Sequence, residues 1–105
     1  MITAADLILR HTAGRTLDDY ERDPYFRAAV ERFLEIIGEA LRRIERHDPA
    51  TAATIPAYRD IIDFRNLLAH GYDSVNHAFV WHYIETDLPA LRERVQALLD
   101  QAGHQ

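Results

Sequence analysis

The feature that most constrains the fold of this sequence is a long helical pattern that begins at Asp23-Pro24. An acidic residue before proline is a strong start signal, because the carboxylate can cap free N–H groups and proline suits the first helical position. Apolar residues then recur at three- and four-residue steps as far as about His47: Phe26, Val30, Phe33, Ile37, Leu41 and Ile44. Four charged residues fall largely off this stripe: Glu31, Glu35, Arg42 and Arg46. The spacing predicts one amphipathic helix, and Gly38 inside it predicts the close approach of another helix.

Two shorter elements are expected before this helix. Thr3 can cap a first helix that runs to about His11 or Ala13, and Gly14 then breaks it. The stretch 16–20 has the composition of a short capped turn that leads into the long helix.

Residues 48–55 are expected to form a loop. Pro56 can open a third helix that runs to about His70, and Gly71 is suited to the position just past its end. Tyr58, Ile61, Ile62, Leu68 and Ala69 mark the inward face of that helix.

A fourth helix follows, capped by Asp73 or Ser74, with apolar positions at helical spacing: Val75, Phe79, Val80, Tyr83 and Ile84. Residues 87–89 (Asp-Leu-Pro) kink or restart it, and the tail frays at Gly103. Nothing is typical of a strand, so the predicted fold class is all-α, an antiparallel four- or five-helix up-down bundle. Residues 1–105 form a single predicted domain.

The composition fits a small intracellular protein. Of 105 residues, 48% are hydrophobic, which supports one modest core and makes pairing into a homodimer plausible on stability grounds. There is no cysteine, so neither a disulfide framework nor a thiolate zinc site can form. The first residues carry no basic start and no long apolar run, and no stretch approaches a membrane span. We therefore expect a cytoplasmic location.

The charge limits the kinds of nucleic-acid binding. A formal net charge of −5 argues against broad binding to a long duplex, where many cations must neutralise phosphates. It leaves room for a local cationic pocket. All twelve basic residues are arginine, the better bidentate phosphate ligand, although a GC-rich genome would give the same bias.

Arg65 is the anomaly on the third predicted helix, because it falls on the inward face. A guanidinium there needs a partner, since an unpaired buried charge is strongly unfavourable. Two alternatives remain open from the residues alone. One is a structural salt bridge inside the bundle, with Glu35 or Glu39 as partner. The other is a phosphate held in a groove between two subunits.

His70 stands at the end of the same helix, where the partial negative charge favours an imidazolium. It is either a C-terminal capping residue or an acid/base for RNA chemistry, because histidine titrates near neutral pH. Arg65 and His70 are five residues apart, about 140° around a helix, so a symmetric dimer would help to bring these groups around one cleft. Asn66 and Tyr72 add an amide and a phenol beside the same spot.

The run from Arg65 to Tyr72, RNLLAHGY, resembles the R-x4-H-x-Y motif of the HepT branch of the HEPN superfamily. The segment 33–40 (FLEIIGEA) is similar to that family's second-helix signature. Val80-Trp81 followed by 87–89 is similar to its last-helix signature. An R-x4-H string alone is weak, but three signatures in the right order, over nearly the whole chain, are specific.

The resemblance implies a homodimeric HEPN bundle that acts as a metal-independent endoribonuclease toxin and needs no cofactor. Its partner would be an MntA-like minimal nucleotidyltransferase, the antitoxin, which transfers AMP to the tyrosine of the motif. Carried over, Arg65 would bind the scissile phosphate, His70 would be the acid/base, and Asn66 would be a supporting polar group. Tyr72 would be the AMP acceptor, or alternatively a staple that packs its loop onto the bundle.

Other candidates have simpler interpretations. Trp81 with Phe79 and Tyr83 could stack RNA bases, but core or dimer packing is the expected role. His77 and His82 lie five apart on different helix faces, which disfavours a two-histidine metal site. The competing function is a non-catalytic helical module that binds or presents substrate to a nucleotidyltransferase.

Overall fold

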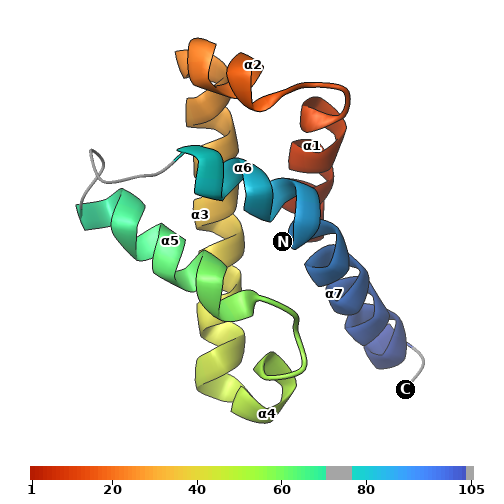
Figure 1. Ribbon diagram of the computed structural model, residues 1–105. Helices are drawn as coiled ribbons and strands as arrows, with labels where there is room; N and C mark the ends of the chain where they lie inside the picture. Colours follow the sequence, from red (N-terminus) through yellow and green to blue (C-terminus); the bar gives the residue numbers. More distant parts are fainter. Residues whose placement is uncertain (71–76, 104–105) are drawn as a thin grey trace.

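A single long helix, α3 (Pro24–His47), is the spine on which most of the other helices pack (Figure 1). The computed structural model describes residues 1–70 and 77–103, with the backbone alone for 65–70. Within these ranges every regular element is an α-helix, which confirms the all-α prediction. Asp23 caps α3 as expected, because its Oδ1 accepts a hydrogen bond from the backbone N–H of Phe26 at 3.1 Å.

Two helices precede the spine. In α1 (Ile2–Thr12) the first backbone bond runs from the Ala5 N–H to the Met1 carbonyl, so Thr3 lies inside the helix and the predicted Thr3 cap is wrong. The chain then turns at Gly14, whose φ of +75° suits glycine. The capped turn predicted next is α2 (Leu17–Arg22), where Thr16 and Asp19 form a reciprocal capping box.

The segment expected as a loop after α3 contains a further helix, α4 (Pro49–Ala52). Asp48 caps it, and Oδ1 of this residue accepts from the Thr51 N–H at 3.1 Å. The loop prediction is therefore wrong over these residues. The cause is the same aspartate–proline start signal that opens α3, here followed by a single turn.

The third predicted helix begins later than expected. It is α5 (Tyr58–His70), and Pro56 lies before it. Ala57 has a φ of 56°, in the left-handed region, so the backbone turns at that residue and the helix starts only after it. The described helix reaches His70, the residue at which the prediction ended it.

The last part of the chain forms α6 (His77–Thr86) and α7 (Leu88–Gly103), separated at Asp87. This confirms the predicted restart around residues 87–89. The predicted cap at Asp73 or Ser74, the apolar position Val75 and the C′ residue Gly71 lie outside the described residues.

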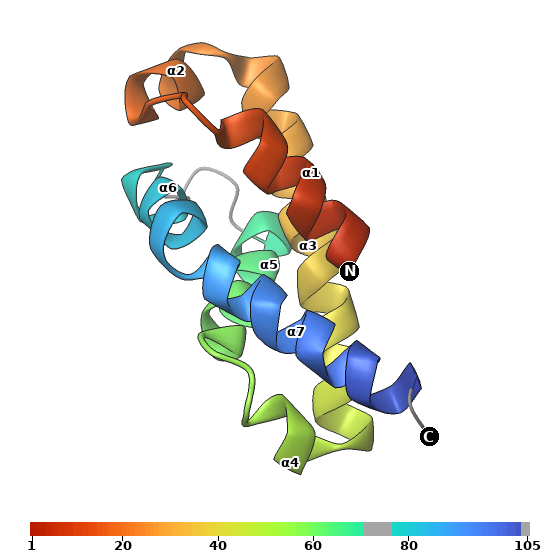
Figure 2. The same cartoon turned by 90° about the vertical axis from the view of Figure 1, so that its right-hand side faces the viewer.

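Packing joins the helices into one bundle around the apolar face of α3. α1 and α5 both pack against α3, and α7 packs against α1 and α6 (Figures 1 and 2). Arg92 of α7 also binds Asp6 of α1, with Nε 2.8 Å from Oδ1, and this hydrogen bond lowers the pKa of the Asp6 carboxyl. The fully buried core draws on every one of these helices: Ile8, Leu34, Ile37, Leu41, Ile61, Ile84, Leu88 and Leu91.

No helix in the described part of the chain combines the length and the apolar character needed to cross a membrane.

Candidate functional site

The helix that carries the arginine–histidine motif is continuous through both residues. Arg65 and His70 belong to the last turns of α5, and Asn66 lies between them in the same helix. The positions are five residues apart, which corresponds to a rise of about 7.5 Å and a rotation of about 140°. The side chains of all three lie outside the described part of the structure, and so does the whole of Tyr72.

The apolar face of α5 is fixed against the core. Ile61, Ile62 and Phe64 are each buried, at 5% exposure or less. Leu34 of α3 lines a small cavity together with Ile61 and Phe64, so it faces the middle of α5. The predicted inward positions Ile61 and Ile62 are confirmed, and Tyr58 packs partly buried against the core. The motif is therefore at the end of a helix whose preceding two turns are immobilised by packing.

The start of α5 is held by two polar contacts. Arg59 pairs with Glu45 of α3, with Nη2 3.1 Å from Oε2. Tyr83 of α6 donates a hydrogen bond from its hydroxyl to the carbonyl oxygen of Ala57 at 3.3 Å. Burial raises the pKa of the Tyr83 hydroxyl, so this group stays a neutral donor across the physiological range. Together these contacts fix where α5 starts relative to α3 and α6.

The face of α3 toward α5 carries a residue that the sequence prediction misplaced. Glu31 was expected off the apolar stripe, but its exposure is only 4%. It shares a helical face with Leu34, Gly38 and Glu45, at steps of three, four and seven residues. Leu34 and Glu45 both meet α5, so Glu31 continues the α5-facing side of α3 toward its N-terminus. Gly38 is buried on that face, as expected for close helix approach.

Glu35 and Glu39 were proposed as internal partners of Arg65, whose side chain lies outside the described part of the structure, so that pairing stays a prediction. Glu35 lies 3.5 Å from Nη1 of Arg32, one helical turn away, and its side chain is 35% exposed. Glu39 is half-buried. Glu31 is a buried carboxylate in this region. Its burial could have been predicted from the sequence, because it lies three and seven residues before Leu34 and Gly38, on the same face of the helix. A second apolar face of α3, beyond the stripe through Ile37 and Leu41, would have included it.

Aromatic residues anchor the helix that follows the motif. The ring of His77, the first residue of α6, lies edge-on to the buried Tyr20 with centroids 5.7 Å apart. The ring centroid of Trp81 lies 5.4 Å from that of the same tyrosine. Trp81 and Tyr83 are both 5% exposed, so these aromatics serve core packing, which agrees with the expectation. Phe79, for which core or dimer packing was expected, is 50% exposed.

The described histidines do not gather with other metal ligands. Across residues 1–70 and 77–103, no three histidine, aspartate or glutamate residues come close enough to hold a metal ion. His11, His47 and His82 are exposed on three different helices. His77 is half-buried against Tyr20.

An all-helical bundle built on one long helix, with an arginine–histidine motif at the end of a packed helix, is the arrangement expected of a HEPN-type protein. The family model for "Ribonuclease HepT-like" matches residues 1–98. The chain therefore belongs to the HepT-like ribonuclease family of the HEPN superfamily, which confirms the resemblance seen in its motifs.

Curated relatives span most of the chain. A protein named "Probable ribonuclease HepT" from Thermococcus cleftensis is 32% identical over 90% of this chain and 86% of its own length. One named "Putative RNase" from Caldanaerobacter subterraneus subsp. tengcongensis is 27% identical over 96% of this chain and 89% of its own length. A Methanocaldococcus jannaschii protein named "Gamma-glutamylcyclotransferase and putative RNase" is 26% identical over 96% of this chain and 45% of its own length. No solved structure matched the chain.

Proposed function

We propose that this protein is an endoribonuclease that cleaves RNA at a site formed by Arg65 and His70. The observation that carries the proposal is the family match over residues 1–98, together with the intact R-x4-H-x-Y motif within it. The names of the curated relatives point to the same activity. The continuous α5, fixed against α3 by Ile61 and Phe64, gives the motif a rigid support.

The proposed reaction is an internal transesterification. The ribose 2′-oxygen attacks the phosphorus atom, the bond to the 5′-oxygen of the next nucleotide breaks, and a 2′,3′-cyclic phosphate remains. Arg65 binds the phosphate oxygens and offsets the charge that develops on them. His70 accepts the 2′-hydroxyl proton or donates one to the leaving 5′-oxygen, and Asn66 supports the site as a polar group. The reaction needs no metal ion or cofactor.

The active form in this proposal is a homodimer. About 140° separates the two positions around α5, so one copy alone does not aim both groups along one line. A second copy of the same helix end, related by a twofold axis, would complete one cleft. The last turns of α5 lie at the outer edge of the bundle, where a partner could approach (Figure 1).

The proposed regulation acts on Tyr72. An MntA-like nucleotidyltransferase antitoxin would transfer AMP to its hydroxyl, with pyrophosphate leaving from ATP. The added phosphodiester and base would occupy the mouth of the cleft and offset its cationic charge. The protein would then be the toxin of a toxin–antitoxin pair.

Expression in a host cell, with and without the candidate antitoxin, tests the toxin assignment. Wild-type protein alone should arrest growth, whereas the Arg65→Ala and His70→Ala variants should not. Co-expression should restore growth and add AMP-sized mass increments that map to Tyr72. A stable complex with the nucleotidyltransferase, no growth arrest and no RNA cleavage would instead favour a non-catalytic binding module, which the net charge of −5 would suit.

A further inference from the structure

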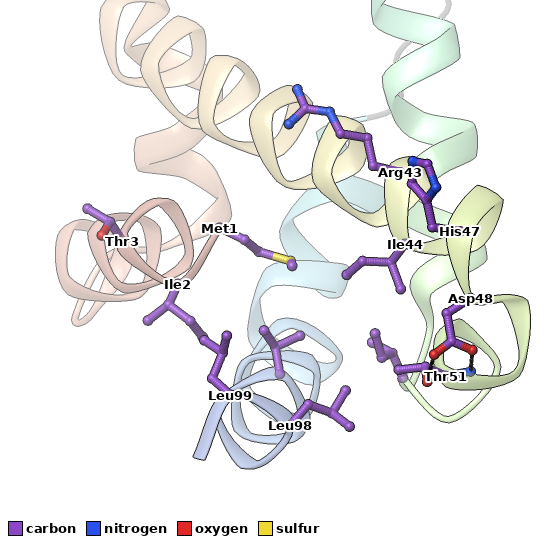
Figure 3. A pocket seen from close by; sticks show the side chains of 12 residues that line it. Met1, Ile2, Thr3, Arg43, Ile44, His47, Asp48, Thr51, Leu98 and Leu99 are labelled. Carbon is purple, nitrogen blue, oxygen red and sulfur yellow. Dashed lines mark hydrogen bonds between the residues drawn. The ribbon is translucent and has the colours of Figure 1, made fainter. Parts of the chain in front are cut away.

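An open apolar groove lies at the end of the bundle where α3 finishes (Figure 3). Its volume is about 630 Å³, and it is bounded by the start of α1, the end of α3, α4 and the second half of α7. These four segments are far apart in the sequence, so no local pattern marks the groove. Its apolar lining comes from the start of the chain, α3, the turn after α4 and α7: Met1, Ile2, Ile44, Ile55, Val95, Leu98 and Leu99.

The apolar side chains converge on the groove without filling it. Met1 and Ile44 point toward one another across it, and Leu98 and Leu99 close the α7 side (Figure 3). Leu99 is 53% exposed, although the same helix also carries the buried Leu91 and Val95. Exposed apolar surface that is grouped in a concavity is typical of a binding surface.

One rim of the groove carries basic side chains. Arg43 and His47 stand along its α3 side, and the Arg43 guanidinium points away from the apolar centre (Figure 3). Arg42, Arg43 and Arg46 also line an adjoining hollow of about 400 Å³ on α3, together with Glu39. None of these three guanidinium groups pairs with a described carboxylate.

Two acidic residues near the groove, Asp48 and Glu45, have partners within the chain. Asp48 accepts hydrogen bonds from the backbone and hydroxyl of Thr51, and these bonds lower the pKa of its carboxyl. Glu45 pairs with Arg59 of α5. The cluster of three arginines thus stands out on a chain whose net charge is −5.

We propose that this groove docks an amphipathic, acidic helix of a partner protein. Apolar side chains one helical turn apart would enter between Ile44 and Leu99, and carboxylates on the flank of that helix would meet Arg43 and Arg46. This is the helix-in-groove mode of recognition, in which apolar anchors supply affinity and flanking charges set orientation. RNA fits less well, because its phosphates would match the arginines but leave the apolar floor uncovered.

The surface is separate from the proposed catalytic site. Ile55 lines the groove, and α5 starts just after it and leads away for 13 residues to His70. That length is about 20 Å. A partner on the groove would therefore leave the end of α5 free, and the docking proposal stands or falls independently of the ribonuclease proposal.

Fluorescence anisotropy with two labelled synthetic peptides tests the docking proposal. One is an amphipathic helix of about four turns with leucines on one face and glutamates on the flank. The other is the same peptide with lysine in place of each glutamate. The acidic peptide should bind at least about tenfold more tightly, because only it complements the arginine rim. Equal binding of the two peptides, or no binding of either, would overturn the proposal.

Matched variants locate the binding surface. The double variant Arg43→Glu/Arg46→Glu should weaken binding of the acidic peptide at least about tenfold. Arg10→Glu/Arg22→Glu makes the same change in net charge elsewhere on the surface and should have little effect. Leu99→Glu should weaken the binding of both peptides. The control is Tyr25→Glu, at a tyrosine that is 90% exposed on the far end of α3, and it should leave the binding of both peptides unchanged.

Circular dichroism should show unchanged helical content in all four variants, since each substituted side chain is exposed. If each groove variant and its matched control lost the same amount of peptide affinity, the assignment of binding to this groove would be overturned. A single-stranded RNA oligonucleotide serves as the competitor. If RNA binds through Arg43 and Arg46 and the acidic peptide does not, the surface is a nucleic-acid path and the proposal is wrong.

Discussion

The Nη2 atom of Arg59 lies 3.1 Å from Oε2 of Glu45, and this ion pair joins the first turn of α5 to the C-terminal part of α3. Eleven residues further along the same helix stands His70. Since Ile61 and Phe64 are buried just beyond the ion pair, the contacts at the start of α5 determine where its far end lies.

Glu45→Gln should lower the thermal unfolding midpoint slightly, because the carboxylate raises the pKa of Arg59 and so stabilises its charged form. The effect should shrink in high salt, since the Arg59 side chain is 63% exposed. Thermal unfolding followed by circular dichroism measures it. Glu93→Gln removes one of two carboxylates that contact Arg92, away from α5, and serves as the control. A larger loss for Glu93→Gln would contradict the role given to Glu45.

Asp23→Ala should destabilise the protein by about 1 kcal/mol, because it removes the cap from the first turn of α3. Urea unfolding gives the free energy directly. Glu85→Ala, an exposed acidic residue within α6, should change stability by less than about half of that. Equal effects of the two substitutions would show that the cap contributes nothing.

Glu31→Ala should cost more than Glu35→Ala, because Glu31 is 4% exposed whereas the side chain of Glu35 is 35% exposed. A buried carboxylate persists only with compensating interactions, and their loss is expected to cost about 2 kcal/mol. Urea unfolding of both variants makes the comparison. If Glu31→Ala is as stable as the wild type, the carboxylate does not stabilise the α3–α5 side of the bundle.

Stability should fall at high pH because of Tyr83. Its ordinary pKa is 10.0, and burial raises the pKa in the folded state. The unfolded chain therefore loses this proton first, and stability that is constant below pH 10.0 is lost as the pH rises above that value. Unfolding of wild type and Tyr83→Phe across this range tests the sign. The variant should be less stable at neutral pH but show a weaker decline, whereas an identical decline would exclude Tyr83 as the cause.

The sequence predicted those parts of the fold that depend on local signals. Asp23-Pro24 marked the start of α3, Thr16 and Asp19 marked α2, and Asp87-Leu88-Pro89 marked the restart before α7. Asp48-Pro49 carries the same signal as Asp23-Pro24, but the helix after it is too short to show an apolar period. The late start of α5 depends on the left-handed φ of Ala57, which alanine rarely adopts and which no pattern indicated.

Features that depend on tertiary packing were harder to predict from the sequence. Glu31 was misplaced because the apolar stripe of α3 was drawn for one partner helix, whereas α1 and α5 pack on different faces. The groove at the end of α3 needs four segments that meet only in the folded chain. The R-x4-H-x-Y motif was visible because it is contiguous, and the roles of Arg65, Asn66, His70 and Tyr72 within it stay a prediction.

The most direct test is cleavage of an end-labelled RNA by purified protein in the presence of a metal chelator. The account predicts that wild-type protein cuts the RNA and leaves 2′,3′-cyclic phosphate ends. It predicts that Arg65→Ala and His70→Ala each slow the reaction at least about 100-fold. Arg10→Ala and His11→Ala, at exposed positions of α1, should cut at the wild-type rate. Cleavage by the Arg65 and His70 variants at the wild-type rate would contradict the central claim.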